Sequence, residues 1–234
     1  MRMTALLAVV LAGTASCGRA GPESLPAGPA TLVLQVTVSP SSPRPWERGQ
    51  VPRFSLYGGG RVIVPAGGDD ALRSAREYRL SPGAYRDLVD RAYSAGLDRG
   101  GEIDNRAETD SSLLTITLST AGGVRTTRVV APDDGDDVSE FVRTLPETPA
   151  DAIAYRPVAV AVLATGGVGS EGTVRPWPLE PLERGTRTEA GLCTVTTTAV
   201  PFAGTPQEES RWSSGGKVYA VVGRPLLPAE PGCP

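Results

Sequence analysis

Three pairs of short alternating segments, each joined by a turn rich in glycine or small polar residues, constrain this chain more than any other feature. Apolar and polar side chains alternate along each segment, which is the pattern of a half-buried β-strand. Glycine adopts the positive φ values that tight hairpin turns require. The predicted hairpins cover residues 53–64, 112–130 and 211–222, with turns at 58–60, 120–123 and 213–216. The sequence therefore predicts mainly antiparallel sheets.

Few helices accompany these hairpins. Residues 81–96 combine an N-capping serine, a proline in the first turn and apolar side chains at i, i+3, i+4, i+7 and i+8. Similar spacing over residues 138–145 predicts a second short helix. Residues 205–208 (TPQE) resemble a capping box that opens a third. This order of elements predicts an α+β fold with two small subdomains.

Two further segments are predicted to be strands. Residues 31–38 alternate cleanly, so Leu32, Leu34, Val36 and Val38 are expected on one face. Residues 158–163 form a continuous apolar run that is short enough for a buried strand. The apolar segment 224–228 is expected to run extended along the domain.

Glycine and proline, with 28 and 22 residues, also divide the chain. Residues 17–30 have no apolar period and are expected to form a flexible tether. An N-terminal α+β domain is expected over residues 31–146, followed by a linker at 147–157. The remainder, residues 158–234, is expected to form a C-terminal α+β subdomain.

The beginning of the chain has the anatomy of an export signal. Arg2 is followed by the apolar run 5–12, and small residues precede Cys17. The run is too short to cross a bilayer, which needs roughly 20 apolar residues. The ending Thr14-Ala15-Ser16-Cys17 resembles the lipobox of bacterial lipoproteins, although that family usually has leucine where Thr14 stands. The resemblance implies a signal peptide at 1–16 and a lipid-anchored Cys17 outside the cytoplasm; the alternative is an ordinary secretory signal.

Other segments extend this resemblance. The segment 52–63 (PRFSLYGGGRVI) and the ending with Trp212, 224–228 (RPLLP) and Cys233 are similar to a group of uncharacterised exported lipoproteins from actinobacteria. The group usually has Asp or Asn where Gly59 stands. The resemblance covers most of the chain and implies location and fold, but no activity.

The complete absence of histidine limits the chemistry. Without histidine there is neither a Ser-His-Asp triad nor an imidazole metal ligand. A Ser-Lys dyad would need Lys217, the only lysine, which falls beside a predicted turn where nothing would desolvate it. We therefore predict no catalytic residues, no cofactor and no metal.

Two acidic segments are candidate sites. Residues 133–137 (DDGDD) lack the spacing of a calcium-binding EF-hand loop, and capping of the following helix is the preferred interpretation. Calcium binding by these loops stays open. Glu102, Asp104, Glu108 and Asp110 could supply a carboxylate pair, but the low aromatic content of 5% favours a solvated loop.

The three tryptophans, Trp46, Trp177 and Trp212, are expected to pack at the rim of the core instead of binding a ligand. If a lipid occupies the Cys17 thiol, Cys193 and Cys233 are the two remaining cysteines, and we expect them to form a disulfide in an oxidising compartment.

These observations predict an exported, lipid-anchored envelope protein that binds an unknown envelope protein or glycan without catalysis. The net charge of −3 provides no basic surface for nucleic acid. The alternative is an envelope hydrolase that uses carboxylates alone.

Overall fold

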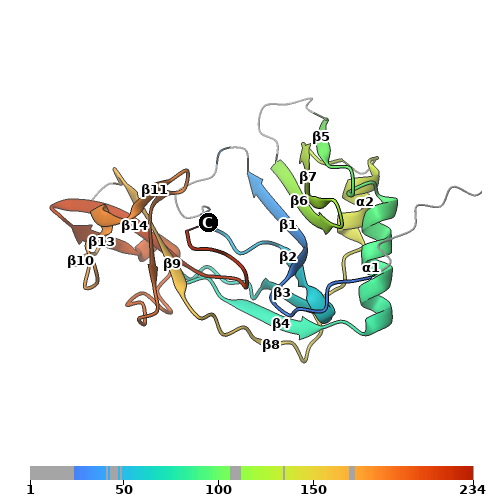
Figure 1. The fold of residues 1–234 in the computed structure, drawn as a ribbon. Coiled ribbons are helices and arrows are strands. Elements are labelled where there is room, and N and C mark those ends of the chain that lie inside the picture. Colours follow the sequence, from blue (N-terminus) through green and yellow to red (C-terminus); the bar gives the residue numbers. More distant parts are fainter. Residues whose placement is uncertain are drawn as a thin grey trace, which may run out of the picture.

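The described part of the chain folds into two β-sheets and two α-helices (Figure 1). The computed structural model describes residues 24–40, 42, 47, 49–105, 112–133, 135–168 and 172–233. The first sheet has the spatial order β5 (Gly101–Asp104), β7 (Gly123–Val130), β6 (Ser112–Thr120), β1 (Leu32–Pro40), β2 (Phe54–Tyr57), β3 (Arg61–Pro65), β4 (Ala75–Arg79) and β8 (Ile153–Ala154). The second has the order β10 (Val174–Pro176), β13 (Arg211–Ser214), β14 (Lys217–Pro225), β9 (Val160–Gly166), β12 (Gly191–Thr196) and β11 (Thr186–Thr188). The helices are α1 (Pro82–Ser94) and α2 (Asp137–Arg143).

Antiparallel pairing dominates both sheets. Within the described ranges, only β5 with β7 and β10 with β13 run parallel. The predicted α+β class with mainly antiparallel sheets is therefore confirmed. The three predicted hairpins are also present, as β2–β3, β6–β7 and β13–β14.

The glycines between β2 and β3 have a backbone role. Gly59 and Gly60 adopt φ values of 66° and 76°, which other residues rarely adopt. A Cβ atom on Gly58 would lie 2.3 Å from the carbonyl oxygen of Gly28, so only glycine permits this approach. The turn thereby brings the segment before β1 against the hairpin.

Helix α1 has the ends that its sequence predicts. The Ser81 hydroxyl accepts a hydrogen bond from the Ala84 amide at 3.2 Å, and Pro82 occupies the first turn. Gly96 follows the helix with φ 77°, as expected for a C-terminal stop. The buried stripe of α1 consists of Tyr85, Leu88, Val89 and Ala92.

The larger core lies between one face of the first sheet and the two helices. Its buried side chains include Leu34, Val36, Phe54, Leu56, Val62, Tyr85, Leu88, Ile116, Leu118, Val138 and Phe141. A second core belongs to the second sheet and includes Val162, Ala164, Phe202, Trp212, Tyr219 and Val221. Each sheet therefore has its own apolar cluster.

Strand β1 departs from simple alternation at its start. A β-bulge shifts its register against β2 between Leu32 and Leu34. Val33 consequently joins the larger core, whereas Leu32 packs on a different cluster that contains Tyr57. The expectation that Leu32 shares a face with Leu34 was wrong, because a bulge interrupts the two-residue period.

Several element boundaries also differ from the sequence prediction. Strand β9 begins at Val160, and Val158 is 90% exposed. Strand β14 continues to Pro225, so part of the expected tail lies inside the second sheet. The expected capping box at Thr205 was wrong: the 3₁₀ turn Gln207–Glu209 has no side-chain cap. The Thr205 carbonyl instead accepts the Ala71 amide at 2.8 Å, which ties this segment to the first half of the chain.

The expected linker and tether both contribute to the folded unit. Strand β8 lies within the expected linker 147–157 and pairs with β4. The Pro26 carbonyl, within the expected tether 17–30, accepts hydrogen bonds from the Gly59 amide at 3.0 Å and from the Tyr85 hydroxyl at 3.0 Å. Residues 1–23, with the expected signal and Cys17, lie outside the described residues. In the part that the structure describes, no helix is both long and apolar enough to span a membrane.

The two sheets meet through the face of the first sheet that lies opposite the helices. Leu72 forms a bridge with Gly223 of β14, and Asp70 forms one with Pro206. Leu227, just beyond β14, packs in a cluster with Tyr57 and Ile63 of the first sheet. This junction leaves a cleft beside it.

Candidate functional site

A cleft of about 670 Å³ lies where β1 faces the end of β14 and the β11–β12 turn. This volume falls in the range of about 300–1,000 Å³ that is usual for small-molecule sites. The described lining residues are Gln35, Thr37, Val38, Ser39, Glu47, Gly49, Gln50, Pro52, Glu189, Ala190, Arg224 and Glu230. They come from both sheets, so neither sheet alone forms this cleft.

One wall of the cleft is the polar face of β1. Gln35 pairs with Ser55 of β2 and with Thr117 of β6, and paired residues of antiparallel strands point to the same face. The Gln35 amide donates to the Ser55 hydroxyl at 3.3 Å. Their neighbours Leu34 and Val36 point into the larger core instead. The alternation of β1 thus places a polar row opposite the helices.

Arg224 is the buried basic residue in the cleft lining. It sits on β14 opposite Ala161 of the central strand β9, and the residue is only 3% exposed. Its Nη2 atom donates to Oε1 of Glu230. The second Glu230 oxygen accepts the Leu227 amide at 2.8 Å, so both carboxylate oxygens are used. A buried cation needs such a partner, because desolvation without one is costly.

Two tyrosines adjoin this ion pair. Burial, and then the nearby Glu230 carboxylate, raise the pKa of Tyr57 above its ordinary value. The buried Tyr57 hydroxyl lies near Ser55 and has no hydrogen-bond partner among the described residues. The Tyr155 hydroxyl donates to the Leu226 carbonyl at 2.8 Å, and burial also raises the pKa of Tyr155. Both hydroxyls therefore stay protonated near neutrality.

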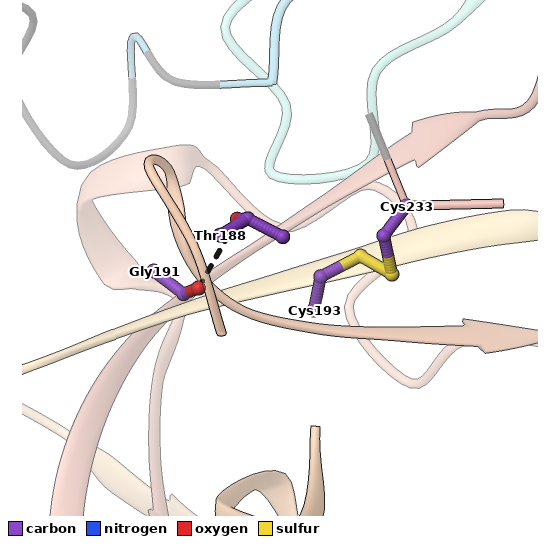
Figure 2. Close-up of a disulfide and its surroundings, with 4 residues drawn as sticks. All are labelled: Thr188, Gly191, Cys193 and Cys233. Carbon is purple, nitrogen blue, oxygen red and sulfur yellow. Dashed lines mark hydrogen bonds between the residues drawn. A yellow bond between two sulfur atoms is a disulfide. The ribbon is translucent and has the colours of Figure 1, made fainter. Parts of the chain in front are cut away.

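The opposite wall is held by a disulfide. The sulfurs of Cys193 on β12 and Cys233 lie at disulfide distance, 2.10 Å. Figure 2 shows this bond beside the turn, where the Thr188 hydroxyl donates to the Gly191 carbonyl at 3.1 Å. Glu189 and Ala190 of this turn line the cleft. The disulfide holds the C-terminal tail, which contains Glu230, beside the same turn.

Lys217 and Ser214, the residues that a Ser-Lys dyad would need, do not have the surroundings of a catalytic pair. Lys217 is exposed at the start of β14, as expected. The Ser214 hydroxyl donates to Glu183 at 2.6 Å and accepts the Leu182 amide at 3.1 Å. The hydrogen bond from Ser214 lowers the pKa of Glu183. Ser214 therefore has a structural role in the β13–β14 turn.

The acidic segment 133–137 caps α2, in agreement with the preferred interpretation. Asp136 accepts the Ser139 amide at 2.6 Å and the Ser139 hydroxyl at 2.7 Å. Asp133 accepts the Gly135 amide at 2.7 Å, and Asp134 lies outside the described residues. Across the residues that the structure describes, no group of three or more acidic or cysteine side chains is placed to hold a metal ion.

The second acidic segment is only partly described. Glu102 and Asp104 are exposed on the edge strand β5. Glu108 and Asp110 lie outside the described residues. Neither described carboxylate belongs to the cleft.

The tryptophans behave as packing residues where they are described. Trp212 is 3% exposed and meets Trp177 edge-to-face with ring centres 5.3 Å apart. The Arg175 guanidinium lies 4.9 Å from the centre of the Trp212 ring, a cation–π contact. Trp46 lies outside the described residues.

Sequence reasoning missed every charged residue of the cleft. Glu47, Glu189, Arg224 and Glu230 are isolated from one another in the chain and share no motif. The one available signal was the disulfide, since it implied that the tail folds back onto the domain. Comparisons of the chain with protein-family models, curated proteins and solved structures found no match.

Proposed function

We propose that the chain is an exported lipoprotein, anchored by Cys17, that binds an envelope protein or glycan in the cleft between its two sheets without catalytic turnover. The observation that carries the binding part is the cleft itself, with the buried base Arg224 in its lining. The anchoring part rests on the lipobox-like residues 14–17 and the short apolar run before them.

The scaffold around the cleft is suited to binding. Arg224 lies on a strand that is paired on both sides, and Gln35 lies on a strand in the middle of the first sheet. The Cys193–Cys233 disulfide attaches the C-terminal tail, which contains Glu230, to β12. Groups fixed before binding lose little conformational entropy when a ligand arrives.

Site-specific photo-crosslinking in the native envelope tests this proposal. A photoreactive amino acid replaces Thr37 in the cleft, and a matched variant carries it at Asp87, an exposed residue of α1 on the opposite side of the first sheet. The expected result is a discrete adduct at Thr37 that is missing at Asp87. Equal labelling at both positions, or none at Thr37, would contradict a ligand site in the cleft.

The cleft also favours one second candidate, the carboxylate hydrolase. Glu47, Glu189 and Glu230 all line it, and paired carboxylates can act as acid and nucleophile or base. Glu230 is already committed to Arg224 and Leu227. If the cleft only binds its ligand, purified protein should show no turnover on glycan, ester, peptide or phosphoester substrates. Saturable turnover that either Glu47→Gln or Glu189→Gln abolishes would replace binding with hydrolysis.

A further inference from the structure

We propose that the second sheet carries a separate site for a small phosphate monoester, whose oxygens accept from Arg187, Lys217 and the hydroxyl of Tyr219. The site is a pocket of about 480 Å³ that these three residues line at the beginning of β14. It lies outside the cleft and does not depend on the binding role proposed for that cleft. Three features carry it: an unpartnered tyrosine hydroxyl, two cations and an open space between them.

The three residues project from one face of the second sheet. Lys217 and Tyr219 are two positions apart on β14, so their side chains leave the same face. Arg187 of β11 joins that face through the pairs of β11 with β12, β12 with β9 and β9 with β14. Arg224 is an odd number of positions from both β14 residues, so it points to the opposite face, toward the cleft.

Tyr219 provides the observation that points to a ligand. The residue is only 3% exposed and belongs to the same buried cluster as Trp212. Its hydroxyl has no hydrogen-bond partner among the described residues, yet it is not sealed from solvent as the Tyr57 hydroxyl is. Buried polar groups normally find a partner in the protein, in water or in a bound molecule. Because Tyr219 lines the pocket, an acceptor bound there can supply this partner.

The two cations of the pocket are exposed and come from different strands, Arg187 from β11 and Lys217 from β14. Neither makes an ion pair or a side-chain hydrogen bond with a described residue. Glu183 interacts with the Lys217 charge beyond ion-pair distance, and its carboxylate accepts from the Ser214 hydroxyl at 2.6 Å. The described lining contains one acid, Glu189, against these two cations. The pocket is therefore suited to an anion.

Glycines keep this space open. Gly166 pairs with Tyr219, and a Cβ atom on Gly166 would lie 3.4 Å from the Tyr219 ring. A Cβ atom on Gly167 would contact nothing within 4 Å. At Gly191, with φ 117°, a Cβ atom would lie 2.6 Å from the carbonyl oxygen of Ala164, so only glycine fits there. The resulting volume falls in the range of about 300–1,000 Å³ that is usual for small-molecule sites.

The donors favour a phosphate monoester over a carboxylate. Arginine, lysine and tyrosine side chains all donate hydrogen bonds, and two of these donors are charged. A phosphate monoester has three free oxygens and a charge of about −1.5 to −2 at neutral pH, so it can accept from three separate side chains. A carboxylate has two oxygens and a single charge. Leu192 and Ala164 in the lining provide apolar area for the organic part of the ligand.

The test is a calorimetric titration of glycerol phosphate, with glycerol as the uncharged counterpart. The protein consists of residues 18–234, which contain every described element. The expected result is saturable binding of glycerol phosphate and no binding of glycerol at the same concentrations.

Three variants identify the pocket. Arg187→Gln and Lys217→Gln should each weaken binding by about tenfold or more, because each removes a charged donor. Arg125→Gln is the matched control: it removes an exposed arginine from β7 of the first sheet and should change little. Tyr219→Phe retains the packed ring and removes only the hydroxyl, so binding should weaken roughly fivefold while urea unfolding stays unchanged. A merely structural tyrosine would not separate these two readouts.

A second titration uses dihexanoyl phosphatidic acid, a water-soluble lipid with the same phosphate monoester. Binding about tenfold tighter than that of glycerol phosphate would identify a lipid headgroup as the source of the phosphate, and similar or weaker binding would identify a soluble metabolite. Either result supports the site. The inference would be overturned if neither phosphate binds, or if Arg187→Gln and Lys217→Gln bind glycerol phosphate as tightly as Arg125→Gln does.

Discussion

The carboxylate of Glu230 holds Arg224, six positions earlier in the chain, and closes the turn after β14 through the Leu227 amide. One side chain thus satisfies a buried cation and fixes the tail that covers it. The side chains of Arg224 and Glu230 are 4% and 19% exposed, so water screens this pair little. Stability and cleft shape therefore depend on the same contact.

Replacement of Glu230 by alanine should destabilise the protein by about 3–5 kcal/mol, because it leaves the Arg224 charge buried without a partner. Equilibrium unfolding in urea measures the change. Glu140→Ala is the control: its pair with Arg143 on α2 is exposed, so its loss should cost no more than about 1 kcal/mol. Equal losses in the two variants would contradict the importance of the buried pair.

Removal of the disulfide should lower the free energy of unfolding by roughly 4 kcal/mol in the chain-entropy model. Cys193 and Cys233 are 40 positions apart, so their bond restricts a long loop in the unfolded state. Cys233→Ser and dithiol reduction of the unchanged protein should have similar effects in urea unfolding. Labelling of both thiols in the denatured but unreduced protein would show that the bond is missing.

Alkaline pH should destabilise the fold through its buried tyrosines. Burial raises the pKa of Tyr78 from 10.0 to about 12, and its hydroxyl donates to the Pro146 carbonyl at 3.4 Å. Above about pH 10 the unfolded state releases this proton first, so stability present below pH 10 falls as the pH rises. Urea unfolding at a series of pH values should show this decline, and Tyr78→Phe should reduce it. A decline of the same size in Tyr78→Phe would exclude Tyr78 as a cause.

Cys17→Ala should release the protein from membranes, because the lipobox-like sequence implies that this thiol carries the lipid. Membrane fractionation and the intact mass of the purified protein measure the effect. Cys17→Ser is a second variant, since a hydroxyl does not replace the thiol in this modification. Native protein that washes off membranes in salt and carries no added mass at Cys17 would contradict the anchor.

Local sequence patterns determined the elements whose causes are local. The α1 helix follows from its cap, its proline and its apolar stripe, and the hairpins follow from alternation and glycine turns. The α+β class follows from the hairpins, and the Asp136 cap from acids placed before a helix. Each of these depends on residues that are close together in the sequence, so periodicity and capping chemistry suffice to predict them.

Only the tertiary structure decided the cleft and several strands. Strands β4 and β12 were not predicted, because each is short and mixes polar with apolar residues. Both are stabilised by neighbours from distant parts of the sequence. Gln35 and Arg224 likewise share one cleft although nearly the whole folded chain separates them. Long-range pairing and the burial of Arg224 depend on how the two sheets dock, and no local pattern encodes that contact.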